Sequence, residues 1–221
     1  YQCLWKFKCI MSQLNVDTLA SQTGTTISVA SGHTLTGAGN LIKLASTTAS
    51  NDTALIFDNF VDLTTYSHYK IVFDRLKPSS DNVSFNFKFR SGGASGSNIT
   101  GTYNQGGDYV YVDHSNGYGT FGNNSISDYQ VYDNNVGSGT GEAVMGEAML
   151  FPATGDTNKN VTAMTHYNMK QRSDDTMRYI HRATFLENTT AVTGFNFYAS
   201  SGNIASGTIR IYGVAKWVNL M

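Results

Sequence analysis

Alternation of apolar and polar side chains with a period of two residues is the feature that most constrains the fold of this chain. The clearest example is the segment 83–89, where Val83, Phe85, Phe87 and Phe89 fall on one face of an expected strand. No segment carries a 3.6-residue apolar stripe longer than two turns. The pattern therefore predicts strands rather than helices.

The same alternation predicts strands along most of the chain after residue 50. They cover residues 69–76, 177–185, 193–197 and 209–211, with shorter apolar runs at 54–57, 109–112, 129–132 and 147–151. Gly, Ser, Thr and Asn number 22, 21, 25 and 20 of the 221 residues, a composition that disfavours helix. Because 40% of the residues are hydrophobic, the chain is too apolar to be disordered. We predict an all-β, jelly-roll-like antiparallel β-sandwich.

Residues 1–50 differ from the rest because their apolar residues are thinly spaced among Thr, Ser and Gly. A segment of this kind cannot close a core by itself. We predict an N-terminal arm or attachment segment over 1–50, with strands added to the sandwich as the alternative, and we expect the sandwich over 51–221. Residues 1–10, which precede Met11, are expected to be an extension that need not be native.

Charge and hydropathy narrow the classes of partner. Nucleic-acid-binding proteins usually carry an excess of basic residues, whereas this chain has a formal net charge of −1, so we expect no nucleic-acid partner. No apolar run reaches membrane-spanning length, so we expect no membrane insertion. The two cysteines, Cys3 and Cys9, both lie in the first ten residues. The fold is therefore expected to depend on packing and not on disulfides.

No Lys or Arg occurs between Arg90 and Lys159, and this gap contains seven Asp and Glu residues and several tyrosines. Tyr combined with Gly, Asn and Asp is typical of recognition loops and suits the apolar faces and hydroxyls of sugars. We interpret 91–158 as a variable loop region that binds a ligand. The candidate ligand-binding residues are Tyr103, Asp108, Tyr111, Asp113, Tyr118, Tyr129 and Tyr132. Burial of these tyrosines within the sandwich is the alternative, weaker for Tyr103 and Tyr118, which lie among turn residues.

Several sequence patterns resemble catalytic or metal-binding motifs, but the residues around them do not fit those motifs. The Gly-rich run 117–122 is followed by a loop composition and not by the helix that dinucleotide binding needs. Glu142 and Glu147 are the only closely spaced glutamates, which leaves a polysaccharide depolymerase as an alternative without further support. His181 is interpreted as a hydrogen-bonded core residue. We expect no catalytic residue, no metal site and no cofactor, with calcium binding by carboxylates of 91–158 as an open alternative.

The segment Thr193–Val214, TGFNFYASSGNIASGTIRIYGV, resembles the closing hairpin of structural proteins from tailed-bacteriophage particles. Asp74–Ser80, DRLKPSS, and the aromatic residues Tyr66–Tyr69 resemble other parts of the same family. The resemblance implies a virion protein of the tail-fibre, receptor-binding type without catalysis, or alternatively a capsid decoration protein. Because a weakly apolar shaft segment needs partners and fibres and decorations commonly supply threefold ones, we expect a homotrimer. Its arm is expected to bind other virion proteins, and loops within 91–158 are expected to bind a host-surface saccharide or protein.

Overall fold

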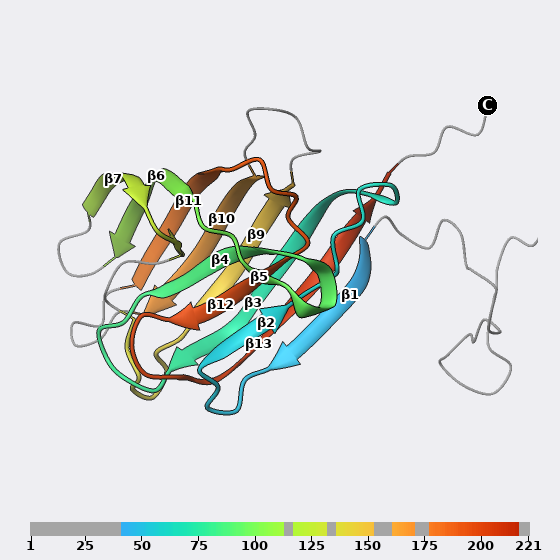
Figure 1. Cartoon of the computed structure of the whole chain (residues 1–221). Helices are drawn as coiled ribbons and strands as arrows, with labels where there is room; N and C mark the ends of the chain where they lie inside the picture. Colours follow the sequence, from blue (N-terminus) through green and yellow to red (C-terminus); the bar gives the residue numbers. More distant parts are fainter. Residues whose placement is uncertain (1–40, 113–116, 132–135, 153–160, 171–176, 217–221) are drawn as a thin grey trace, which may run out of the picture. The chain divides into compact units, whose positions relative to one another are not determined.

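A computed structural model describes residues 41–112, 117–131, 136–152, 161–170 and 177–216 (Figure 1). Within these residues the chain forms two antiparallel sheets and no α-helix, apart from one short 3-10 turn, η1, at Gly93–Ser95. The all-β sandwich predicted from the alternation is confirmed. Most predicted strands are present and are a few residues longer than the sequence pattern indicated.

The larger sheet has eight strands in the order β1-β13-β3-β9-β10-β11-β6-β7. Their bounds are β1 Leu41–Thr48, β13 Ile204–Ala215, β3 Tyr66–Pro78, β9 Val144–Phe151, β10 Val161–Lys170, β11 Met177–Glu187, β6 Thr102–Val112 and β7 Gly117–Ile126. Among the described residues, β1 and β7 are the edge strands of this sheet.

The smaller sheet has five strands: β2, Ala54–Phe57; β12, Gly194–Ala199; β4, Phe85–Ser91; β5, Ser97–Asn98; and β8, Tyr129–Gln130, which pairs with β4. It packs on one face of the larger sheet, and phenylalanine rings fill the space between them. Phe73 of β3 stacks on Phe197 of β12 with ring centroids 5.4 Å apart. The predicted apolar face of 83–89 is buried as expected.

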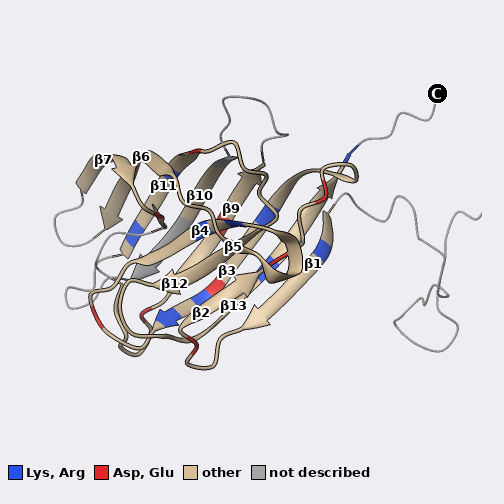
Figure 2. Cartoon of the chain, in the orientation of Figure 1, with Lys and Arg blue, Asp and Glu red and all other residues tan. Residues whose placement is uncertain are grey.

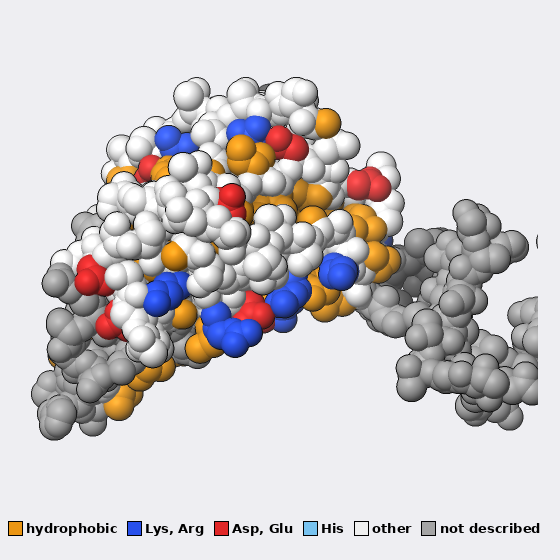
Figure 3. Space-filling model, turned by 90° about the horizontal axis from the view of Figure 1, so that it is seen from below, with side chains coloured by type: hydrophobic (Ala, Val, Ile, Leu, Met, Phe, Trp, Pro, Cys, Tyr) orange, Lys and Arg blue, Asp and Glu red, His pale blue; other side chains and the backbone are white. Residues whose placement is uncertain are grey.

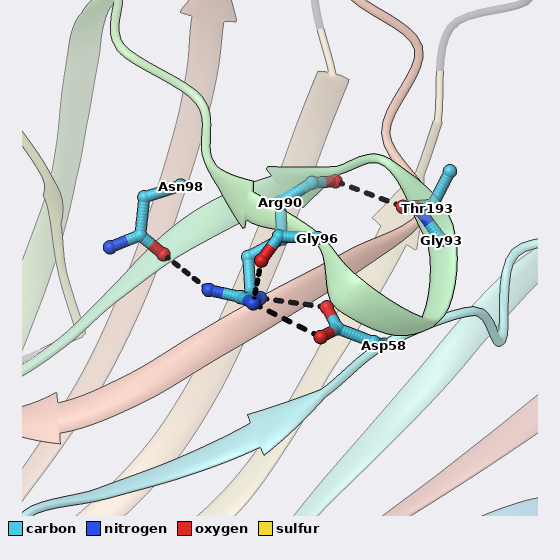
Figure 4. A network of polar contacts seen from close by, with 6 residues as sticks. All are labelled: Asp58, Arg90, Gly93, Gly96, Asn98 and Thr193. Carbon is cyan, nitrogen blue, oxygen red and sulfur yellow. Dashed lines mark hydrogen bonds and ion pairs between the residues drawn. The ribbon is translucent and has the colours of Figure 1, made fainter.

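A largely buried ion pair links Asp58, which directly follows β2, to Arg90 near the end of β4 (Figure 4). The Arg90 guanidinium donates two hydrogen bonds to the Asp58 carboxylate, at 2.7 and 3.0 Å. It also donates to the side chain of Asn98 and to the carbonyl of Gly96. The Arg90 side chain therefore holds together the residue after β2, the residue after the η1 turn, and β5.

Two assignments made from the sequence differ from the structure. Leu41–Thr48 pairs with β13, so for these residues the alternative holds, a strand added to the sandwich, and the arm does not extend to residue 50. Residues 1–40 lie outside the described residues. The presumed loop region 91–158 contains β5 to β9, since its Gly and Asn residues alternate with side chains that fit a strand.

The segment 193–214 is not a hairpin, because β12 belongs to the smaller sheet and β13 to the larger one. The turn between them crosses from sheet to sheet. Gly202 and Gly207 in this segment have φ values of 68° and 112°. A Cβ at Gly207 would lie 2.6 Å from the carbonyl oxygen of Arg75, so the close approach of β3 requires glycine there.

Candidate functional site

Two predicted ligand-binding residues lie in the core. Tyr103 and Tyr129 are fully buried, and their hydroxyls bond to the backbone N–H of Phe89 and the side chain of Thr165. Burial raises the pKa of both phenols. Their assignment to a contact surface is therefore wrong: each ring fills the space between the sheets.

The other predicted residues do not meet at one surface. Tyr111 lies on the inner face of β6, the face directed toward the smaller sheet, whereas Asp108 lies on the opposite, outer face. Tyr118 of β7 also lies on the outer face and is 67% exposed. Asp113 and Tyr132 lie outside the described residues. The sheet itself separates Tyr111 from Asp108 and Tyr118, because neighbouring positions on a strand point to opposite faces.

A row of aromatic rings lies on the inner face of β6 and β7, at the end of the larger sheet shown at the upper left in Figure 1. We call Tyr109, Tyr111 and Phe121 the aromatic shelf. The rings of Tyr109 and Tyr111 have centroids 6.2 Å apart, and those of Tyr109 and Phe121 are 6.5 Å apart. All three side chains are half-buried.

Glycines on the paired strands make room for the aromatic shelf. A Cβ at Gly117 would lie 2.0 Å from the Tyr111 ring, and one at Gly119 would lie 2.4 Å from the Tyr109 ring. Each tyrosine can therefore lie across the backbone of the next strand. The sequence contained a signal for this arrangement, because Tyr-x-Tyr is followed by Gly-x-Gly at a spacing that pairs them in a hairpin.

Two arginines of β11 lie over the aromatic shelf. The Arg178 guanidinium lies 5.4 Å from the centroid of the Tyr109 ring, and that of Arg182 lies 4.0 Å from the Phe121 ring. Arg182 is buried and donates hydrogen bonds to Gln105 and to the carbonyl of Gln130. In such a surface the half-buried rings can stack on the apolar face of a ligand, and the neighbouring guanidinium groups can donate hydrogen bonds to its polar groups.

The outer face of the larger sheet is a second exposed surface, and it is unusually apolar. Twelve large hydrophobic side chains are exposed in the described part of the chain, and the strand registers place all but Ile42 and Ile56 on this face. The ten are Leu41, Val110, Val112, Tyr118, Met145, Phe151, Met164, Met177, Tyr179 and Phe185. Exposed apolar side chains gathered on one face mark interaction surfaces.

The prediction that His181 is a core residue is wrong. Its side chain is 43% exposed on the outer face, because the alternating side chains that face the core on β11 include Ile180, Thr184 and Leu186. His181 lies 3.7 Å from Asp108 and makes a ring contact with His166 of β10 at 4.7 Å. Asp108, His181 and His166 thus form a polar group among the exposed apolar side chains of the outer face.

Charge is unevenly divided over the outer face. Basic residues gather on β1, β3 and β13 (Figure 2); those directed outward are Lys43, Lys70, Arg75, Lys77 and Arg210. Arg210 donates a hydrogen bond to Asp74 at 3.0 Å, and this contact lowers the pKa of the Asp74 carboxyl. By contrast, the outward side chains of β6, β7 and β11 contain no Lys or Arg but include Asp108 and Glu187.

The carboxylates of residues 91–158, the segment without Lys or Arg, do not gather at one place among the described residues. Asp128 accepts a hydrogen bond from the Tyr198 hydroxyl, Glu147 pairs with Lys70, and Glu142 accepts from the backbone N–H of Gly139. In the described ranges no group of three or more His, Cys, Asp and Glu side chains is placed to bind a metal ion. The described strands and loops also include no apolar helix of membrane-spanning length.

Comparison with known proteins gives no relative: no family model, no curated protein and no solved structure matches the chain significantly.

Proposed function

We propose that the chain is a structural protein of a tailed-bacteriophage particle, of the tail-fibre, receptor-binding type, which binds a host-surface saccharide and catalyses no reaction. The segment 1–40 would connect it to other virion proteins. The observation that carries the binding role is the aromatic shelf, where Tyr109, Tyr111 and Phe121 lie in one row beneath Arg178.

The chemistry of the aromatic shelf suits a sugar. The C–H face of a pyranose stacks on an aromatic ring, and the guanidinium of Arg178 can donate hydrogen bonds to ring hydroxyls or to a sugar carboxylate. The rings rest on glycine-bearing strands, so little side-chain entropy is lost when a ligand binds. Of the predicted candidates that the structure describes, Tyr111 alone belongs to this surface.

Replacement of Tyr111 by alanine tests the binding role. The wild-type chain is expected to bind saccharides of the host envelope on a glycan array, and Tyr111→Ala should weaken binding at least about 10-fold, which corresponds to roughly 1.4 kcal/mol of lost stacking. Tyr111→Phe keeps the ring and should bind within about threefold of the wild type. Ile56→Ala, at an exposed site on the smaller sheet, serves as a distant control.

Incubation of the protein with a host-surface polysaccharide separates adhesion from depolymerisation, because only a depolymerase shortens the polysaccharide. A bound polysaccharide should keep its chain length, because the proposal includes no hydrolytic step. Equal binding by the wild type and Tyr111→Ala, or the absence of any bound saccharide, would remove the aromatic shelf as the site. Shortening of the polysaccharide would instead favour the depolymerase alternative.

A further inference from the structure

We propose that His166 and His181, on the outer face of the eight-stranded sheet, bind a divalent transition-metal ion such as Zn²⁺. The inference goes beyond saccharide binding, because the aromatic shelf lies on the opposite face of the sheet. It also differs from a calcium site built of carboxylates, because the ligands are imidazole nitrogens, which suit zinc, nickel and copper.

Strand register brings the two histidines together. His166 of β10 and His181 of β11 are directly opposite each other, and both side chains lie on the outer face. His166 is exposed and His181 is 43% exposed, so an ion can reach both rings from solvent. No local sequence motif predicts this pair, because it is formed by the pairing of two strands.

The spacing of the two rings fits a shared ion. Their centroids are 4.7 Å apart, and their planes are inclined by 61°. Two imidazoles that bind one zinc ion through bonds of about 2.0–2.1 Å have ring centroids roughly 4.5–5 Å apart. The backbone therefore already holds the pair at the separation that a common ion requires.

A carboxylate lies beside the pair and can orient one of its rings. Asp108 of β6 is directly opposite His181, and its Oδ1 lies 3.7 Å from His181 Nδ1. A carboxylate next to one ring nitrogen orients a metal-binding histidine and leaves the other nitrogen, here Nε2, for the ion. Glu147 is opposite His166 on β9, but it pairs with Lys70 at 2.5 Å. We therefore assign Asp108 as a positioning residue and the two histidines as the ligands.

The basic side chains of the outer face belong to other strands. Figure 3 shows Lys and Arg side chains grouped along the lower margin of the described part, with acidic side chains among them. On β3 and β13, Asp74 forms ion pairs with Arg75 and Arg210. The outward side chains of β6 and β11 include no Lys or Arg, and the Arg182 guanidinium lies on the opposite face, over the aromatic shelf. A dication at the histidine pair therefore lies near the Asp108 carboxylate, with no Lys or Arg beside it on these two strands.

A shallow hollow at the pair leaves room for the ion and its water ligands. It has a volume of about 180 Å³, and Asp108, His166 and His181 are among the residues that line it. Gly106 and Ala183, which are paired across β6 and β11, also line it and fill little of it. Two or three waters at about 30 Å³ each would fit beside the ion. Within the described residues no third His, Cys, Asp or Glu completes a metal-binding group, so we expect water at the remaining positions and an ion that a chelator removes.

Isothermal titration calorimetry with zinc chloride tests the site on the full, untagged chain. Cys3 and Cys9 are replaced by serine in every protein compared, because thiolates would bind zinc by themselves. We expect one zinc ion per chain at this site. His166→Ala and His181→Ala should each weaken its affinity at least about 10-fold, and circular dichroism checks that both variants keep the β-sheet signal.

Matched variants and ions separate the site from general binding to the surface. His68→Ala removes another outward histidine of the same sheet, on β3, and should keep zinc affinity within about threefold of the parent chain. Asp108→Asn should weaken it about 10-fold, as expected for a group that orients a ligand. An excess of calcium chloride should not displace zinc, because calcium prefers oxygen ligands.

Nuclear magnetic resonance of the histidine rings gives a measurement in which both ligands remain in place. Substoichiometric Ni²⁺ should broaden the ring signals of His166 and His181 and leave those of His68 sharp. The inference would be overturned by a chain that binds no zinc at about 1 mM, or by folded His166→Ala and His181→Ala variants of unchanged affinity. Displacement of zinc by calcium, or equal broadening at His68, would also overturn it. Saccharide binding at the aromatic shelf needs no metal, so these results leave the proposed function intact.

Discussion

Replacing Phe197 by alanine should lower the free energy of unfolding by about 3–5 kcal/mol. The ring is fully buried between the sheets and stacks on Phe73, at 5.4 Å, and on Phe85, at 5.2 Å. Alanine would remove both contacts and leave a cavity that the paired strands on either side cannot close. Since single domains are stable by only about 5–15 kcal/mol, this one change should remove a large fraction of the total.

Urea unfolding followed by far-ultraviolet circular dichroism measures the effect. Ile56→Ala is the matched control, because Ile56 lies on the neighbouring strand β2 but is 53% exposed; its effect should stay within about 0.5 kcal/mol. A loss below about 1 kcal/mol for Phe197→Ala would mean that this ring does not fill the space between the sheets.

Removal of one partner from the Asp58–Arg90 pair should cost about 3–5 kcal/mol of unfolding free energy. The two side chains are only 14% and 11% exposed, so Arg90→Met leaves a carboxylate largely shielded from water and without its two guanidinium hydrogen bonds. The same change removes the donors to Asn98 and to the Gly96 carbonyl, which hold the η1 turn.

A double-mutant cycle separates the pair from its surroundings. Asp58→Leu combined with Arg90→Met should cost clearly less than the sum of the two single replacements, because no isolated charge remains buried. Thermal or urea unfolding of the four proteins provides the comparison. Strictly additive losses would show that the two side chains do not interact energetically, despite their 2.7 Å contact.

The alternation of Val83, Phe85, Phe87 and Phe89 was enough to predict a buried strand, because all four side chains face the core. The same rule wrongly placed His181 of β11 in the core. There the apolar-looking set that includes Tyr179 and His181 faces outward, and the buried set includes Arg182 and Thr184. Periodicity identifies two faces of a strand, but which face is buried depends on the opposite sheet and on hydrogen-bond partners such as Gln105.

Composition indicated where the candidate site lies along the chain but not which residues form it. Tyr103 and Tyr129 share the sequence environment of Tyr111, yet they fill the core, since burial is decided by the distant β4 and β10. Arg178 and Phe121 could not be found from composition. Their proximity to Tyr109 follows only from the pairing of β6 with both β7 and β11.

We propose that this chain belongs to a virus particle and acts at its surface. Gold-labelled antibody against the sandwich, applied to particles purified from the virus that carries the gene and viewed by electron microscopy, tests it most directly. We expect label at the tail, and label on the head would replace the tail-fibre assignment with the decoration alternative. Particles that carry no label, together with protein found free in the infected cell, would contradict a virion role altogether.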